Sequence, residues 1–242
     1  MTSAPRDHLQ HCFVLHRRHF GNSSLVLEVF SGDHGRQAVL AKGAKQTRGR
    51  RPAVGELLQP FRALWLSWSG RGEVKTLVRS EPAGPDAGLT GKVLYCGLYL
   101  NELLMRLLQR GDPHEALFAF YHLALTDLGA GKDVETVLRH FELRLLREIG
   151  YAVVLDREAA SGRPVSPGRF YVYEQESGLR AAGADDGAAI AGETLLELTA
   201  GGSLSRTAAR DAKTLNRQLL VPHLGARPLK TRELFKPLGP SP

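Results

Sequence analysis

The chain has 242 residues, of which 43% are hydrophobic and 24% are charged. This composition is typical of a globular protein and excludes wholesale disorder, and the length allows one or two domains. No run of about 18 apolar residues occurs, which argues against a membrane span. Residues 1–10 are polar and lack the apolar stretch of a secretory signal. A cytoplasmic protein is therefore expected.

The net charge of +7 is unevenly distributed. Residues 1–81 carry 13 Lys and Arg against 6 Asp and Glu. Residues 82–205 carry 11 against 17, and residues 206–242 carry 8 against 2. Two basic ends thus flank an acidic middle, which indicates a polyanionic partner at the ends.

The first third of the chain is rich in short β-strand patterns. Five apolar or alternating runs occupy residues 13–17, 25–30, 37–41, 64–68 and 74–78, with turn signals at 32–35 and 69–72. Five strands in this length suit a small antiparallel barrel of the OB type. The strand count alone leaves the topology open.

Helical patterns follow. Residues 93–108 are nearly all apolar, which predicts a buried helix, and residues 116–128 predict a second. Residues 134–149 have apolar side chains on one face, with Asp133 suited to the N-cap and Gly150 to the position after the helix. Three consecutive helices with short connections predict a bundle. A last helix is expected at residues 206–220, ending before Pro222.

Residues 151–191 predict loops and short strands, of which 170–174 is the most convincing, and the prolines near residue 85 predict a boundary. The expected fold is α+β and multidomain. Residues 1–82 form a five-stranded OB-type barrel and residues 83–150 a helical bundle. Residues 151–242 form an irregular β-containing region with a C-terminal helix that packs on the bundle.

A basic segment follows the expected third strand, and no acidic residue lies between Asp33 and Glu56. A flexible cationic loop can follow a phosphate backbone, and neighbouring aromatic rings can stack on unpaired bases. The alternative is a solvated loop beside core aromatics. The cations are Arg36, Lys42, Lys45, Arg48, Arg50 and Arg51, and the aromatics are Phe20, Phe30, Phe61, Trp65 and Trp68.

The last expected helix has two opposite stripes. Cations recur at steps of four, three and four, and small or apolar residues recur at the same steps, shifted by two. The cationic stripe is either an anion-binding ridge or an ordinary solvated face. The stripes are Arg206, Arg210, Lys213 and Arg217, and Ala208, Ala212, Leu215 and Leu219.

Catalytic motifs are incomplete. The Gly91-Lys92 pair lacks the upstream glycine and the hydroxyl residue of a phosphate-binding loop, and His114-Glu115 lacks the second histidine of a zincin. The two cysteines, Cys12 and Cys96, exclude a disulfide framework and a cysteine-built zinc site. We therefore expect no enzyme activity, no metal and no cofactor, with a hydrolase or nuclease as an alternative.

Ten strings occur in collinear order within residues 12–236. They are FVLH (13–16), SLVLEVF (24–30), GR (35–36), AKGA (41–44), LQPF (58–61), GRGEVKTL (70–77), YCGLYLNELL (95–104), RHFEL (139–143), IGY (149–151) and PLKTRELF (228–235). Together these strings resemble the RecO family of bacterial recombinational-repair mediators.

The resemblance implies an OB fold, a helical bundle and a C-terminal region that packs back on it. It implies binding of single- and double-stranded DNA, strand annealing, partnership with RecR, docking to the C-terminal tail of single-stranded-DNA-binding protein, and indirect help in loading RecA. Some members of the family carry a four-cysteine zinc site after the helical bundle, which does not carry over because this chain has no cysteine beyond Cys96. An RNA-binding or ribosome-associated OB protein stays open as the alternative, since RNA offers the same phosphates.

Residue by residue, the resemblance implies that Arg139 and Arg210 grip the tail, with Phe141 lining a groove for its ring and Lys213 on the same ridge. Spacing alone favours a weak surface pair between Glu135 and Arg139. The expected DNA contacts in the barrel are Arg36, Lys42, Lys45, Arg48, Arg50, Arg51, Arg71 and Lys75.

Overall fold

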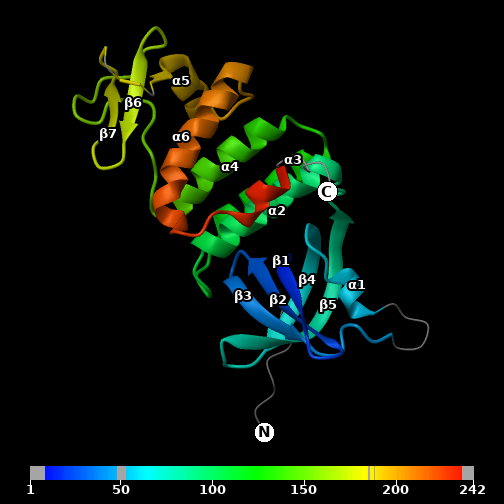
Figure 1. Cartoon of the computed structure of the whole chain (residues 1–242). Helices are drawn as coiled ribbons and strands as arrows, with labels where there is room; N and C mark the ends of the chain where they lie inside the picture. Colours follow the sequence, from blue (N-terminus) through cyan, green and yellow to red (C-terminus); the bar gives the residue numbers. More distant parts are fainter. Residues whose placement is uncertain (1–8, 48–52, 185, 188, 236–242) are drawn as a thin grey trace, which may run out of the picture. The chain divides into compact units, whose positions relative to one another are not determined.

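A computed structural model describes residues 9–47, 53–184, 186–187 and 189–235 (Figure 1). The chain forms two compact units. The first unit contains residues 1–129 and 229–242, and the second contains residues 130–228.

The first unit is built on a closed five-stranded barrel (Figure 1). Its strands are β1 (Gln10–Phe20), β2 (Ser24–Ser31), β3 (Gly35–Ala41), β4 (Arg62–Ser69) and β5 (Val74–Asp86). The order around the barrel is β1-β2-β3-β5-β4, with β1 pairing with β4 to close it and only β3 and β5 parallel. The fold class predicted from the strand patterns is therefore confirmed: a five-stranded OB-type barrel followed by helices and a small strand region.

The barrel core consists of the inward-facing side chains of all five strands. Leu27, Val29, Val39 and Leu64 are among the residues with no exposed surface. Because side chains alternate along a strand, the residues between them face outward. The short helix α1 (Val54–Leu57) lies within the connection between β3 and β4.

Two helices pack on the barrel through a buried polar link. They are α2 (Gly91–Leu107) and α3 (Glu115–Gly129). The Asn101 side chain of α2 donates to the Leu15 backbone oxygen of β1 at 2.9 Å and accepts from the Tyr121 hydroxyl of α3 at 2.5 Å. Buried polar groups need such partners, so this chain of hydrogen bonds orients both helices on the barrel.

The end of the chain returns to the first unit. The short 3₁₀ helix η1 (Lys230–Phe235) packs on α2, and the Glu102 carboxylate accepts from the backbone nitrogens of Lys230 and Thr231 and from the Thr231 hydroxyl. Burial alone would raise the pKa of Glu102, but these hydrogen bonds outweigh it and lower the pKa. An ionised Glu102 therefore anchors the C-terminal segment.

The second unit combines three helices with a small sheet. The helices are α4 (Val134–Glu148), α5 (Gly192–Ala200) and α6 (Arg206–Leu224). The sheet has the order β7-β6-β8, from β6 (Phe170–Glu174), β7 (Gly178–Ala181) and β8 (Ile190–Ala191). The predicted ends of α4 are confirmed: the Asp133 side chain accepts from the Thr136 backbone nitrogen at 2.8 Å, and Gly150 has a φ of 90°.

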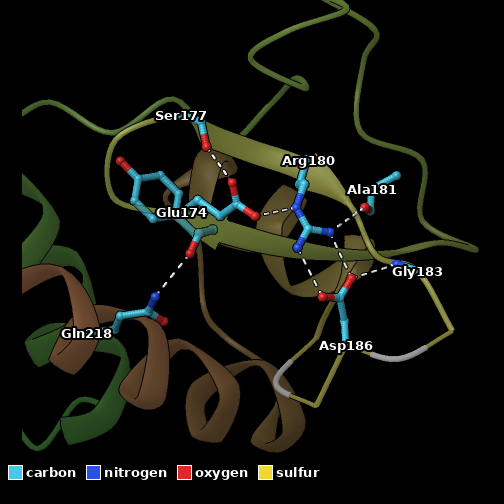
Figure 2. A network of polar contacts seen from close by, with 8 residues as sticks. Glu174, Ser177, Arg180, Ala181, Gly183, Asp186 and Gln218 are labelled. Atoms are coloured by element: carbon cyan, nitrogen blue, oxygen red, sulfur yellow. Dashed lines mark hydrogen bonds and ion pairs between the residues drawn. The ribbon is translucent and has the colours of Figure 1, made fainter.

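An arginine-centred network ties strands β6 and β7 to the loop between β7 and β8 (Figure 2). The Arg180 guanidinium of β7 binds Glu174 of β6 at 2.5 Å and both carboxylate oxygens of Asp186 at 2.8 and 3.0 Å. Asp186 also accepts from the Gly183 backbone nitrogen at 2.7 Å. One side chain therefore links two strands and the loop that precedes β8.

One predicted helix end is wrong, and one predicted boundary coincides with the end of a strand. Residues 82–86, where a domain boundary was expected, form the last part of β5, which ends at Asp86. Strand β3 pairs with β5 only at residues 74–76, so the later residues have one free edge, where proline is tolerated. The last helix continues through Pro222 to Leu224, because the buried Leu220 and Leu224 extend its apolar stripe while Pro222 itself is exposed.

The two units cut across the three expected parts. The helices α2 and α3 belong to the first unit and α4 to the second, so residues 83–150 are divided between them. The three-part division stays a prediction. None of the helices in the described ranges is long and apolar enough to cross a membrane.

Candidate nucleic-acid and peptide interfaces

The two lysines after β3 lie at the same end of the barrel as the β1–β2 turn. The Lys45 backbone nitrogen donates to the Ser23 oxygen at 3.0 Å, and the Gly43 nitrogen donates to the Ser24 hydroxyl at 3.4 Å. Gly43 has a φ of 64°, which favours glycine. The Lys42 and Lys45 side chains are exposed, so these hydrogen bonds present two cations beside the turn.

The same end of β1 carries further exposed side chains that were not among the predicted DNA contacts. Every residue from His16 to Phe20 is exposed. The Arg17 guanidinium donates to the Gly55 backbone oxygen at 2.9 Å and is held against α1. Residues 16–20 read HRRHF, a local cluster of basic and aromatic residues. This composition is the sequence signal that could have predicted a DNA contact here.

The prediction that Arg36 is a DNA contact is not supported by its surroundings. Its side chain is only 15% exposed and lies 3.3 Å from the Glu28 carboxylate, which Arg110 also binds. Burial lowers the pKa of Arg36 against the opposing effect of Glu28. Arg36 is thus committed to an internal ion pair, although its Nε atom lies buried without a partner in the described residues.

The remaining predicted DNA contacts fall into two groups. Arg71 and Lys75 lie at the turn and start of β5, and Lys75 is beside Val39 in the parallel register. Val39 lies three residues before Lys42, so Lys75 is beside the second half of β3, and Arg71 precedes the start of β5. Arg48, Arg50 and Arg51 lie outside the described residues.

The aromatic side chains of the barrel separate into buried and exposed groups. Phe30 and Phe61 are buried, and Trp68 packs on the barrel core. Trp65 is partly exposed and stacks on His11, with ring centroids 5.1 Å apart. Phe20 is 52% exposed. Of the five aromatics considered from the sequence, only Phe20 and Trp65 are exposed enough to meet a ligand.

The two opposite stripes predicted for the last helix are confirmed in α6. The apolar stripe is buried, whereas the cationic ridge of Arg206, Arg210, Lys213 and Arg217 is exposed. Arg210 is 79% exposed and bonds its neighbour Asp211, and Lys213 is 60% exposed and binds Glu135 of α4 at 2.9 Å. The ridge is therefore accessible, with acidic neighbours offsetting part of its charge.

Arg139 and Phe141 do not lie on that surface. The Arg139 side chain is 6% exposed and pairs with the buried Glu142 at 3.1 Å, with Glu135 further away at 3.8 Å. The prediction of a surface pair with Glu135 is therefore wrong, because the Arg139 side chain is buried. Phe141 has no exposed surface, so it does not line an open groove for a peptide ring.

An open cavity of about 420 Å³ lies further along the same two helices. Its wall includes Leu146 and Tyr151 at the end of α4, Leu219 and His223 of α6, and Tyr173 of β6. Tyr151 stacks on His223 with ring centroids 3.9 Å apart, and burial lowers the pKa of His223. Tyr151, Tyr173 and His223 give the wall aromatic surface that suits an apolar or aromatic side chain. The lining also contains the Glu176 carboxylate and the amides of Gln175 and Gln218.

Within the described ranges, no group of three His, Cys, Asp or Glu side chains is placed to hold a metal ion. Cys12 and Cys96 are both buried, and burial raises the pKa of Cys12 well above its ordinary value. A thiol that stays protonated is a poor nucleophile, which agrees with the interpretation of Cys12 as an inert side chain.

Comparisons with known proteins agree over nearly the whole chain. Residues 6–85 match the family described as Recombination protein O N terminal, and residues 89–233 match Recombination protein O C terminal. A "DNA repair protein RecO" from Aromatoleum aromaticum is 47% identical over 240 residues, covering 98% of this chain and 99% of the relative. Relatives of the same name from Nitrosospira multiformis and Methylococcus capsulatus are 45% and 46% identical, covering 96% and 94% of this chain and 96% and 93% of themselves. The chain belongs to the RecO family of DNA repair proteins.

Proposed function

We propose that this chain is a non-enzymatic mediator of DNA repair and recombination, which binds single- and double-stranded DNA through its barrel and anneals complementary strands. The observation that carries the proposal is the exposed cationic end of the barrel, formed by Lys42, Lys45 and Arg18. Cations that neutralise phosphates give affinity without reading sequence. Annealing needs this kind of contact, because the strands must still search for their complement.

The proposal extends to the second unit. The exposed ridge of α6 would contact the acidic C-terminal tail of single-stranded-DNA-binding protein, with Arg210 and Lys213 as the principal contacts. The cavity beside Leu219 would take the aromatic ring of the tail. Six residues separate Lys213 from Leu219, a rise of about 9 Å along a helix, and an extended peptide covers that distance in about three residues.

Arg139 and Phe141 enter this proposal only as residues that hold α4 in place. The guanidinium of Arg139 is committed to Glu142, and Phe141 is fully buried. Their contribution to the tail site would be to position the helix that lies beside the ridge. Partnership with RecR, indirect help to RecA and a cytoplasmic, nucleoid-associated location rest on family membership.

Fluorescence anisotropy of the whole chain tests both parts. Labelled single-stranded DNA, duplex DNA and a labelled tail peptide are titrated against the wild type and the double variant Arg210→Gln/Lys213→Gln. Each lost charge-assisted bond is worth about 1.5–3 kcal/mol, so tail binding should weaken at least tenfold while DNA binding changes little. A matched control is Arg163→Gln, another exposed arginine of the second unit.

Equal losses of affinity for the tail peptide and for DNA in the double variant would refute separate binding sites. Failure of the wild type to bind DNA would refute the mediator, and a strong preference for RNA with no tail binding would favour the RNA-binding alternative.

A further inference from the structure

One aromatic side chain and two cations share the outer surface of the barrel at the β1–β2 end. Leu25, Leu27 and Val29 of β2 face the core, so the alternate residues of β2 face outward. Phe20 pairs with Ser24 and Arg18 with Val26, which are outward positions. Phe20 and Arg18 therefore lie on the outer face of β1.

A bulge in β1 is the reason for this orientation. The register shifts between Val14 and His16, so two residues of β1 oppose one residue of β2 at that point. Val14 belongs to the barrel core. Without the shift, strict alternation from Val14 would turn Arg18 and Phe20 inward. The extra residue places them outward instead.

Lys42, the residue directly after β3, completes the group. The Gly43 nitrogen donates to the Ser24 hydroxyl at 3.4 Å, and Val26 pairs with Leu40. Because Leu25 pairs with Ala41, the next residue, Lys42, lies beside Ser24. Ser24 in turn pairs with Phe20 and lies between Lys42 and Phe20. Phe20, Ser24 and Lys42 thus form a row across the barrel surface, and Arg18 lies two residues before Phe20 on the same face of β1.

The three side chains remain exposed on this outer face, although Val26 beside Arg18 is buried. Rings of α3 cover the opposite end, where Phe118 and Tyr121 contact Phe30 with centroids 5.5 and 6.2 Å apart. Phe20 is 52% exposed, and Arg18 and Lys42 are exposed. The carboxylate of this face of β2, Glu28, is occupied by Arg36 and Arg110.

We propose that Phe20, Arg18 and Lys42 form a stacking site for an unpaired base of single-stranded DNA, with the two cations contacting the phosphates on either side of that base. This rests on the proposed DNA-binding function and adds a preference for single strands at this end of the barrel. A base in a duplex already has both faces stacked, so only an unpaired base can cover the Phe20 ring. Every base offers such a face, so the site does not select a sequence.

Substitutions at this site should weaken DNA binding in two distinct ways. Removing the ring removes stacking and leaves the charges, whereas removing a lysine or arginine removes a phosphate contact. A single exposed phenylalanine is common in soluble proteins. What distinguishes Phe20 is its position among cations on an uncovered sheet face.

The test uses the whole chain and two labelled probes of about 15 nucleotides. One probe is oligodeoxythymidine, and the other is an abasic deoxyribose-phosphate oligomer with the same number of phosphates. Phe20→Ala should weaken binding of oligodeoxythymidine about tenfold and leave binding of the abasic probe and the salt dependence unchanged. Phe20→Trp should retain affinity, and its fluorescence should be quenched by oligodeoxythymidine beyond the wild-type signal. The control is Phe170→Ala, another exposed phenylalanine, located in the second unit.

Unchanged binding of oligodeoxythymidine by Phe20→Ala, with normal binding by the wild type, would overturn the stacking site and leave DNA binding intact. An equal loss for the abasic probe would overturn it too, because that loss cannot come from stacking. If the wild type bound neither probe, the proposed function would fail together with this inference. Phe20→Trp keeps the test valid if Phe20→Ala folds poorly.

Discussion

The side-chain amide of Asn216 in α6 donates a hydrogen bond to the carboxylate of Glu142 in α4 at 2.8 Å, where both side chains are buried. The same amide donates to the Arg139 backbone oxygen at 2.9 Å. Buried polar groups tolerate few alternative partners, so this contact fixes one position of α6 along α4. The position of the cationic ridge of α6 relative to α4 therefore depends on this contact.

Replacing Asn216 by alanine should destabilise the protein by about 2 kcal/mol, because a buried carboxylate and a buried carbonyl each lose a donor. Urea unfolding of the wild type and the variant measures this change in the free energy of unfolding. The control is Thr214→Ala, an exposed position of the same helix, which should change stability by less than about 0.5 kcal/mol. Equal effects of the two substitutions would show that the hydrogen bonds contribute nothing measurable.

Replacing Arg139 by alanine should also destabilise the protein, by about 3 kcal/mol or more, since Glu142 would keep a buried charge without its cation. Adding Glu142→Gln should recover part of this loss, because a neutral amide needs no counter-charge. Tail-peptide affinity measured on the folded fraction separates the two roles of Arg139. If Arg139→Ala abolished tail binding at wild-type stability, the guanidinium would be a direct contact instead of a positioning residue.

Local patterns predicted the parts of the structure that depend on a single element. Alternation in short runs identified all five barrel strands, because one face of each strand is buried. Steps of four and three along residues 206–217 identified both faces of α6, since the helical period alone separates them.

Contacts between distant residues could not be predicted in this way. Arg36 looked like a free cation because Arg110 and Glu28, which lie 82 residues apart, meet beside it only in the folded barrel. Phe141 was expected to line a groove because of the family resemblance, whereas the apolar face of residues 134–149, to which it belongs, is the buried face of α4. The outward position of Phe20 depends on a bulge that no turn signal marks.

Replacing Lys42 and Lys45 together by glutamine should reduce the salt dependence of DNA binding. Each phosphate contact to a single strand adds about 0.7 to the slope of log affinity against log salt, so losing two should lower it by about 1.4. Anisotropy titrations at several salt concentrations measure the slope. Lys92→Gln, at the start of α2, is the matched control. An unchanged slope in the double variant would remove this end of the barrel from the DNA path.

The Arg180 network should make the small sheet of the second unit sensitive to acid. The hydrogen bonds from Arg180 and then Gly183 lower the pKa of Asp186 from 3.8 to about 2. A carboxylate whose pKa is lowered in the folded state adds stability above its unfolded pKa and loses it as the pH falls through the folded value. Wild-type protection of the β6 and β7 amides from hydrogen exchange should therefore decrease between pH 3.8 and about 2. The network is solvent-accessible, so added salt should weaken the effect.

The variant Arg180→Met removes the guanidinium and keeps a side chain of similar length. Its sheet amides should exchange faster than those of the wild type at neutral pH, and the loss of protection between pH 3.8 and about 2 should disappear. Arg163→Met serves as the control, because Arg163 is 70% exposed and approaches Glu158 only to 3.8 Å. Retention of the wild-type acid response in Arg180→Met would mean that a group other than Asp186 controls the sheet. Loss of the response, with faster exchange confined to β6, β7 and the loop after them, would identify the ion-pair network as what holds this sheet together (Figure 2).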